Sequence, residues 1–328
     1  MKPGALDLAE QGHPAPEGCP EVTVIIPTRN RRAFLRQSVN DALRQEDVDL
    51  EVVIVDDGST TADSLRDVES LDPRIRIVRH ATRRGPACAR NTGINNARGK
   101  WVAFFDDDDR WSPLKLRKQL DAATASGTSW GYAGALTIDA EDRVLSAAAA
   151  PDEASIMHSL LQFNGLPGGC SNVIAKADVI RAVGGFDERL SLIADWDLWI
   201  RLAEAGPPAA CDEFLIGYRL HGDNMHVRDV DAIYGEFAYM AAKYPATRLG
   251  QPLHPDLSSS ALAWQAQANR RAGNRGAAAH LYLRRLRLTH DPADLVRVAA
   301  ALLGERVIRA LLRRRSRRLR PLWPDSGR

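Results

Sequence analysis

Cysteine is scarce in this sequence, and its spacing argues against two kinds of stabilised site. The four cysteines lie far apart, with no CxxC pair and no histidine at ligand spacing: Cys19, Cys88, Cys170 and Cys211. We therefore expect neither a structural zinc site nor a disulfide framework, and we interpret the cysteines as reduced thiols of an intracellular protein. Long hydrophobic runs are also missing, because no segment approaches the roughly 20 consecutive apolar residues that span a bilayer.

A glycine-rich phosphate-binding loop is missing after the first expected strand. That strand covers residues 22–27 (VTVIIP), and the sequence PTRNRR stands where a nicotinamide-dependent dehydrogenase would carry GxGxxG. A sugar nucleotidyltransferase would show a glycine-rich loop with Lys or Arg at the same place. The dehydrogenase class is therefore disfavoured, and the nucleotidyltransferase is kept only as an alternative.

Charge of the two signs is unevenly distributed along the 328 residues. Residues 1–225 carry 25 Lys and Arg against 34 Asp and Glu, whereas residues 226–328 carry 19 against 8. Residues 1–20 contain Pro and Gly but no apolar core of a signal peptide, so we expect a disordered leader there. The charge pattern indicates two parts with different partners, residues 21–225 and residues 226–328. The second part is rich in Ala, Leu and Arg, so we expect a helical region with a basic tail there.

Buried strands alternate with helical patterns over the first hundred residues after the leader. The expected strands are rich in β-branched and aromatic residues and cover 22–27, 51–55, 75–78, 101–105 and 130–138. Apolar residues at helical spacing predict helices over 33–45, 91–97 and 195–205. This alternation indicates an α/β domain with a mostly parallel sheet flanked by helices. Ligands of such sheets bind at the carboxyl ends of the strands.

The most informative strand end carries four consecutive carboxylates, Asp106, Asp107, Asp108 and Asp109, directly after WVAFF. Four adjacent negative charges repel one another, and a buried strand has no structural need for them. A divalent cation that also binds a diphosphate removes the conflict, because Mg²⁺ and Mn²⁺ prefer oxygen ligands. Read alone, a run of acidic residues is more often a solvated loop, and its position after the strand favours a metal site.

Two other strand ends carry polar residues. Asp56 and Asp57 follow the second strand, where they either cap a helix or bind a ribose or nucleobase. Pro27, Thr28 and Arg29 follow the first strand as a simple turn or as part of the same site. Each signal is weak by itself. Together with the four aspartates they place three polar clusters at one edge of one sheet.

Four motifs in order resemble glycosyltransferase family 2 over about residues 22–225. They are VTVIIPTRNR, EVVIVDDGS, RGPACARNTGINNARGKWVAFFDDDD and GGFDERLSLIADWDLWIRLAEAG. The resemblance implies a GT-A fold over residues 21–225, which would place Pro27, Arg29 and Asp57 around the nucleoside. It also places the DxD-type signature on residues 106–108, with Asp107 near the ribose and Asp108 on the metal. We add Thr28, Asp56, Asp106 and Arg90 to the expected donor-binding residues.

The acceptor side of the family motif is commonly Glu-Asp-aromatic-Asp, and here it is ADWD. Ala194 replaces the Glu, while Asp195 keeps the position of the general base. The alternative for Asp195 is a structural N-cap of the following helix. The segment YRLH also resembles the family, which would place His221 near the metal or the diphosphate, although a lone His is often structural.

These residues predict an inverting transfer of a sugar from a UDP- or dTDP-linked donor, with Mg²⁺ or Mn²⁺ as cofactor. The expected acceptor is a hydroxyl group of a glycan, a lipid-linked glycan or a small molecule. The alternative to an enzyme is a non-catalytic nucleotide-binding or scaffolding protein on the same fold, which the Ala194 substitution slightly favours. Intact Asp57, Asp108 and Asp195 argue against that alternative.

The basic residues near the C-terminus are compatible with several functions. Six arginines fall within residues 313–320, after an amphipathic pattern over residues 295–307. Such a helix can lie on an anionic membrane, so we expect a cytoplasmic protein that associates with the inner face of the cell membrane. A helix packed on the α/β domain, or non-specific attraction to nucleic acid, would give the same pattern. We expect no specific nucleic-acid partner.

Overall fold

The computed structural model describes residues 18–60, 65–161, 163–220, 230–245, 257–271 and 273–303. Both His221 and the arginines of residues 313–320 lie outside this part of the chain, so their expected roles stay predictions. The strands are β1 (Val22–Thr28), β2 (Leu50–Asp56), β3 (Ile75–Arg79), β4 (Trp101–Phe104), β5 (Arg110–Trp111), β6 (Trp130–Ile138), β7 (Val144–Ala148), β8 (Ile174–Lys176) and β9 (Ala209–Arg219).

Seven α-helices and one 3₁₀ helix of the described chain come before β9 in the sequence, and four more helices follow it. They are α1 (Arg32–Leu43), α2 (Arg66–Glu69), α3 (Pro86–Asn96), α4 (Lys115–Ser126), α5 (Glu153–Ser159), the 3₁₀ helix η3 (Gly169–Asn172), α6 (Ala177–Ala182), α7 (Ala194–Ala205), α8 (Val230–Lys243), α9 (Leu257–Arg271), α10 (Arg275–Thr289) and α11 (Ala293–Leu303). No helix in the described ranges is both long enough and apolar enough to cross a membrane.

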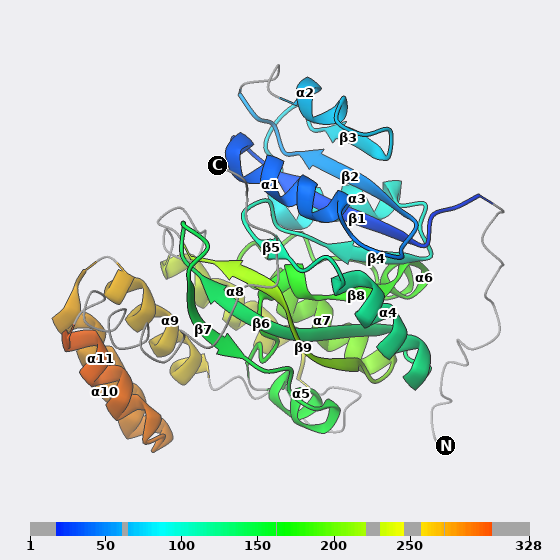
Figure 1. The fold of residues 1–328 in the computed structure, drawn as a ribbon. Helices are drawn as coiled ribbons and strands as arrows, with labels where there is room; N and C mark the ends of the chain where they lie inside the picture. The colour runs from blue at the N-terminus through cyan, green and yellow to red at the C-terminus, as the bar shows by residue number, and fades with distance from the viewer. Residues whose placement is uncertain are drawn as a thin grey trace, which may run out of the picture.

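The sheet has nine strands in the order β3-β2-β1-β4-β8-β6-β9-β5, with β7 paired to β6 (Figure 1). The first four strands are parallel to their neighbours, as the alternation of strands and helices predicted. Beyond β4 the sheet is mixed: β8 is antiparallel to β4 and β6, whereas β6 and β9 run parallel. The α/β class is therefore confirmed, and the sheet is wholly parallel only in the half built from β1 to β4, residues 22–104.

Alternate residues of the strands enter two separate cores. On one face, Val24 and Ile26 of β1 pack with Leu35 and Val39 of α1 and with residues of α4. On the other face, Ile25 packs with residues of α3, α6, α7 and α8. Successive side chains of a strand point to opposite faces, so a continuous apolar run such as VTVIIP needs helices on both sides.

Most predicted elements agree with the structure to within a residue or two, but α3 starts earlier than expected. The pattern predicted a helix over 91–97, whereas α3 begins at Pro86. Gly85, with φ at +97°, precedes the helix, and Pro86 occupies its first turn, where the missing N–H costs nothing. The sequence GP is therefore a start signal that the apolar pattern alone did not reveal.

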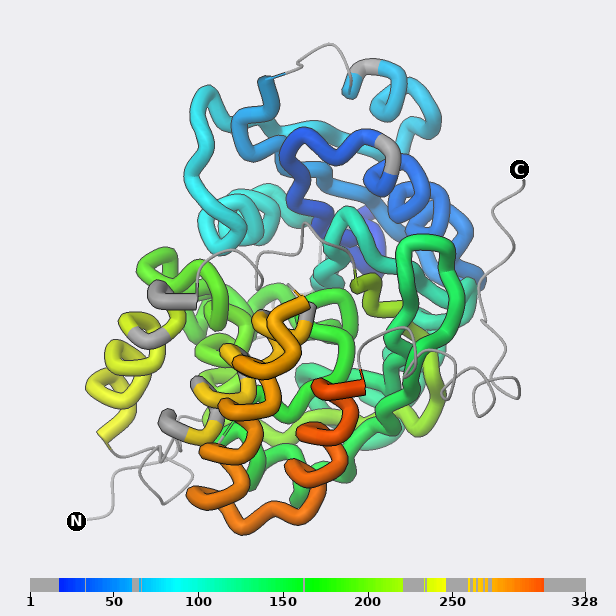
Figure 2. The backbone as a smooth tube through the Cα atoms, turned by 90° about the vertical axis from the view of Figure 1, so that its left-hand side faces the viewer, coloured from blue at the N-terminus to red at the C-terminus, as the bar shows by residue number. Residues whose placement is uncertain are grey.

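The described helices after residue 225 differ in where they pack. Ile233, Phe237 and Met240 of α8 belong to the same core as α7. In contrast, α9, α10 and α11 form a helical layer at one side of the sheet domain, with a small core of their own around Ala278 and Tyr282 (Figures 1 and 2). The expected boundary at 225/226 stays a prediction, and α8 is the helix that joins the two parts.

Candidate active site

Three strand ends lie together at one edge of the sheet. β1 is parallel to both β2 and β4, and the register places Thr28 opposite Asp56 and Ile25 opposite Phe104. The segment after β4 is tied to β1, because the amide of Phe105 donates to the carbonyl oxygen of Ile25 at 2.9 Å. The structure thus brings together the three polar clusters that the sequence placed at strand ends.

The cluster after β1 and β4 is joined by an arginine that we did not single out from the sequence. The Thr28 hydroxyl donates to Asp107 Oδ2 at 2.7 Å. Arg31 Nη1 lies 3.2 Å from Asp107 Oδ1 and 2.5 Å from Asp108 Oδ2. One guanidinium therefore bridges the two carboxylates that the resemblance assigns to the ribose and the metal.

The electrostatics of this cluster show an excess of negative charge. Burial raises the pKa of Asp107 to about 7, and the neighbouring charge of Asp108 adds to the effect, whereas Arg31 opposes it. Burial alone would lower the pKa of Arg31, but Asp107 and Asp108 outweigh it and raise that pKa. Carboxylates this close together favour a bound cation, and Arg31 supplies one here.

A second cluster connects Asp106 to the expected general base. Arg90 is 7% exposed and its Nη2 lies 2.5 Å from Asp106 Oδ1. Asp195, at the second position of α7, accepts hydrogen bonds from its neighbouring Trp196 amide at 2.8 Å and from Asn164 Nδ2 at 3.0 Å. Burial raises the pKa of Asp195, while the Trp196 amide and the charge of Arg90 partly oppose that rise.

The third cluster holds the loop after β3 against the end of β2. Asp57 accepts hydrogen bonds from His80 Nδ1 at 2.8 Å and from the amides of Arg84 at 2.7 Å and Gly85 at 2.9 Å. Burial alone would raise the pKa of Asp57, but these donors outweigh it and lower that pKa. This carboxylate therefore ties the loop that carries Arg84 and Gly85 to the end of β2, and its role toward a nucleoside stays a prediction.

The remaining expected donor-binding residues differ in exposure. Asp56 is fully buried, accepts a hydrogen bond from the Ser59 amide at 2.9 Å and lies 3.3 Å from Arg79 Nε. Arg29 is exposed and Pro27 half-buried, both at the open end of β1. Their nucleotide roles stay predictions, and the structure assigns Asp56 a structural role in the turn as well.

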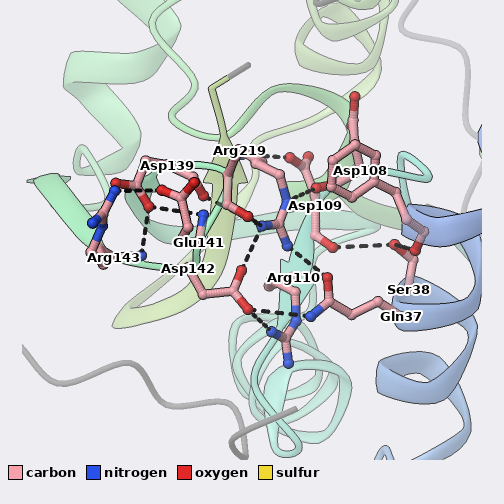
Figure 3. Close-up of polar contacts among 12 residues, drawn as sticks. Gln37, Ser38, Asp108, Asp109, Arg110, Asp139, Glu141, Asp142, Arg143 and Arg219 are labelled. Carbon is pink, nitrogen blue, oxygen red and sulfur yellow. Dashed lines mark hydrogen bonds and ion pairs between the residues drawn. The ribbon is translucent and has the colours of Figure 1, made fainter. Parts of the chain in front are cut away.

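The fourth aspartate is bound into the protein. Asp109 is 1% exposed and accepts hydrogen bonds from the Arg219 amide at 2.8 Å and from Ser171 Oγ at 2.5 Å. The Arg219 side chain donates to the carbonyl oxygen of Asp108 at 2.6 Å (Figure 3). Ser38 Oγ lies 3.0 Å from the carbonyl oxygen of Asp107. The turn that carries the acidic residues is therefore fixed by buried groups from α1 and β9.

The sequence analysis missed Arg31, Ser38, Ser171 and Arg219 as site residues. Two of them had a signal. Arg31 stands in the PTRNR segment, and Arg219 ends the apolar strand pattern LIGY, where a buried arginine requires acidic or carbonyl partners. For the two serines the sequence offers no signal, because one hydroxyl against a distant carbonyl has no local pattern.

The residues at the turn fit a divalent cation. In the described part of the chain, no group of three or more His, Cys, Asp or Glu side chains converges in metal-binding geometry. Mg²⁺, however, is commonly held by one or two carboxylates together with substrate phosphates. The pair Asp107 and Asp108 already binds a cationic group, Arg31, between its oxygens. The site is thus suited to a cation that arrives with a diphosphate.

Comparison with known proteins identifies the family. The model for glycosyl transferase family 2 matches residues 23–148. An uncharacterized glycosyltransferase of Nostoc sp. is 30% identical over 224 residues, which cover 65% of this chain and 68% of that protein. The chain belongs to glycosyltransferase family 2. The succinoglycan biosynthesis protein ExoO of Rhizobium meliloti is 40% identical over 114 residues, or 35% of this chain and 33% of that protein.

Solved structures agree on the fold of this family 2 member. The mannosyltransferase PcManGT from Pyrobaculum calidifontis, in complex with GDP-Man and Mn²⁺, has a TM-score of 0.55 at 21% identity and covers 89% of both chains. S. aureus TarS 1-349, in complex with UDP-GlcNAc, has a TM-score of 0.56 at 16% identity and covers 90% of this chain and 92% of that one. The chain spans a third to a half of the first curated relatives that it matches.

Proposed function

We propose that this protein transfers a sugar from a nucleoside-diphosphate sugar to an acceptor hydroxyl and inverts the anomeric centre. The observation that carries the proposal is the acidic turn after β4, where Asp107 and Asp108 share the guanidinium of Arg31 next to the end of β1. The family 2 fold and the buried carboxylate of Asp195 at the start of α7, whose pKa burial raises, support a general base in addition.

The donor would bind at the ends of β1, β2 and β4. Pro27, Arg29 and Asp57 are proposed to surround the nucleoside, and Asp107 the ribose. A divalent cation, Mg²⁺ or Mn²⁺, would be held by Asp108 with help from His221, and it would stabilise as a Lewis acid the charge of the departing diphosphate. The similar solved structures are complexes with GDP-Man and Mn²⁺ in one case and with UDP-GlcNAc in the other, which supports a donor and a cation of these classes.

Asp195 would take the proton of the acceptor hydroxyl. The acceptor oxygen then forms a bond to the anomeric carbon as the bond from that carbon to the diphosphate breaks, and the proton ends on the Asp195 carboxylate. Burial helps, because a base works best when its pKa lies nearer the working pH than that of a free carboxylate. Asn164 and the Trp196 amide hold the carboxylate in place.

The acceptor is proposed to be a glycan, a lipid-linked glycan or a small molecule. The names of two relatives favour a polysaccharide: succinoglycan biosynthesis for one and chondroitin synthase for another, which is 28% identical over 243 residues. We further propose a cytoplasmic location, with contact to an anionic membrane through the basic residues 313–320.

The first experiment measures thermal stabilisation of the full chain by UDP, dTDP and GDP, each with and without Mn²⁺. A protein saturated at 100 times its Kd gains about 2.7 kcal/mol, which is a measurable shift in melting temperature. We expect a Mn²⁺-dependent shift with one base, lost in Asp108→Ala and kept in Asp121→Ala, which removes an exposed carboxylate of α4. No shift with any nucleotide would contradict the proposal and favour a scaffolding role.

A further inference from the structure

A buried carboxylate outside the site described above lies just before the helix that carries Asp195. Glu236 of α8 is 9% exposed. Its Oε1 accepts hydrogen bonds from the amide of Ser191 at 2.8 Å and from the Ser191 hydroxyl at 2.7 Å. Its Oε2 accepts from the amides of Leu192 at 2.9 Å and Ile193 at 3.0 Å. Three consecutive backbone amides thus converge on one side chain that is more than forty residues away in sequence.

These amides precede α7, and α7 has no cap from its own chain segment. Its N-cap residue is Ile193, whose side chain makes no capping hydrogen bond. The N–H groups at the start of a helix lack partners within the helix, and a negative charge there is favourable. A carboxylate bound by several consecutive amides is a stable arrangement for the same reason. Glu236 therefore fixes the entry into α7, two residues before Asp195.

Residues of α8 and the residue that follows it also contact Trp196 and Asp197, which come directly after Asp195 or two positions on. Phe237 packs edge-to-face on Trp196, with ring centroids 6.0 Å apart. Lys243 Nζ, at the end of α8, and the hydroxyl of Tyr244, the next residue, lie 2.5 and 2.7 Å from Asp197 Oδ1. Asp195 is thus bracketed by contacts from α8, while its own carboxylate binds Asn164 and the Trp196 amide.

We propose that Glu236 is a positioning residue for the general base: it fixes the start of α7 so that the Asp195 carboxylate faces the acidic turn. The inference rests on the proposed function, since it assumes that Asp195 is the base. None of the hydrogen bonds of Glu236 reaches β1, β2 or the turn after β4, where the donor is proposed to bind. Loss of Glu236 should therefore slow turnover and leave nucleotide binding unchanged.

The experiment compares full-chain variants in donor hydrolysis, in which water replaces the acceptor, with UDP-GlcNAc and GDP-mannose as probes. Because a misplacement of about 1 Å costs on the order of 100-fold in rate, we expect Glu236→Gln to lower kcat by about 10-fold to 100-fold. The KM for the donor and the Kd for its nucleoside diphosphate, UDP or GDP, should stay within about two-fold. Glu236→Asp keeps the charge and should recover part of the rate.

The matched control is Glu51→Gln. Glu51 is 7% exposed and, like Glu236, accepts hydrogen bonds from a hydroxyl and a backbone amide, those of Thr23 and Arg98 at 2.8 Å. It also pairs with Arg76 Nη2 at 2.9 Å, so its loss should cost at least as much stability, and it lies at the opposite end of β2 from the site. Melting temperatures of both Gln variants measure the general cost of losing a buried carboxylate. We expect both to melt earlier and only Glu236→Gln to lose turnover.

The outcomes separate the two proposals. If Asp195→Asn abolishes hydrolysis while Glu236→Gln turns over at the wild-type rate, the positioning role is wrong and the proposed function stands. If Glu236→Gln loses nucleotide binding together with turnover, its effect is global and the inference is also overturned. If Asp195→Asn hydrolyses the donor like the wild type, the proposed function itself has failed.

Discussion

Arg219 offers a sharp test of how the acidic turn is held. The side chain is 1% exposed. It donates to the Asp108 carbonyl oxygen at 2.6 Å and to Gln37 Oε1 at 2.8 Å, and its Nη1 lies 2.6 Å from Asp142 Oδ1 (Figure 3). We consider the substitution Arg219→Met, which keeps most of the apolar stem and removes the guanidinium.

The burial of Arg219 determines how much stability Arg219→Met should lose. Removing one partner of a buried ion pair costs about 3–5 kcal/mol, because the other charge is left without compensation. Asp142 keeps its ion pair with Arg110 Nη1 at 2.5 Å and 21% exposure of its side chain, so both offset part of the loss. We therefore expect about 3 kcal/mol, near the lower end of that range. Against a total stability of about 5–15 kcal/mol, this is a large fraction.

Arg143 is the matched control in the same region. It pairs with Asp139 at 2.7 Å and with Glu141, but its side chain is 51% exposed. Exposed ion pairs contribute about 0–1 kcal/mol to stability, so Arg143→Met should lower the free energy of unfolding by less than about 1 kcal/mol. Urea denaturation, monitored by tryptophan fluorescence, measures the free energy of unfolding of both variants.

Arg219→Met should also weaken the Mn²⁺-dependent nucleotide shift, because the Asp108 backbone loses its tether, whereas Arg143→Met should leave the shift intact. Equal losses of stability in the two variants would refute the reasoning from burial.

Three further predictions concern the base, a buried lysine and the tail. Because burial raises the pKa of Asp195, the acid limb of kcat should lie above the usual range of an aspartate, and activity should fall as pH drops through it; Asp195→Asn should lower kcat by about 10²–10⁴-fold and abolish this limb. Lys115 is fully buried 3.8 Å from the Trp111 ring centroid, its Nζ has no hydrogen-bond partner among the described residues, and burial holds its pKa well below the usual range. Unfolding therefore takes up a proton, so stability should fall as pH drops below about 10.4 until the folded-state pKa is passed, and Lys115→Met should flatten this slope and stabilise the protein at pH 7 by about 1–3 kcal/mol in urea denaturation; an unchanged slope would mean that the amine stays charged over Trp111. The full chain should float with anionic liposomes and a chain ending at Leu311 should not; a full chain that stays in the pellet would end the membrane proposal.

The parallel half of the sheet could be predicted because β1, β2 and β4 consist almost entirely of apolar residues. β1 and β2 are each buried on both faces, and that pattern survives in the sequence as VTVIIP and EVVIV. The strands and pairings of the other half are harder to predict from the sequence. β8 has only three residues, and the pairing of β6 with β9 shifts register near Gly134. Such short and irregular strands are set by tertiary packing, which local patterns do not record.

The site was predictable where its residues follow strands and unpredictable where they arrive from elsewhere. Asp57 and Asp108 were found because parallel strands end at one edge. That Asp195 lies near the acidic turn came from the resemblance, since no spacing rule joins residues 106 and 195. The roles of Glu236 and Arg219 depend on hydrogen bonds to distant backbone groups, and such contacts have no periodic signature in the sequence.

The four aspartates illustrate the difference between a pattern and its chemistry. As a sequence, Asp106 to Asp109 form one repulsive run that calls for a cation. In the structure each carboxylate has its own environment: Asp106 pairs with Arg90, Asp107 and Asp108 share Arg31, and Asp109 is bound by Ser171 and the Arg219 amide. Only the middle two converge on one cationic group, so the charge that a divalent cation would neutralise is localised there. Asp106 pairs with a different arginine, Arg90, and Asp109 is buried in the core. The pair of carboxylates that we propose to bind the cation is therefore narrower than the run of four letters indicates.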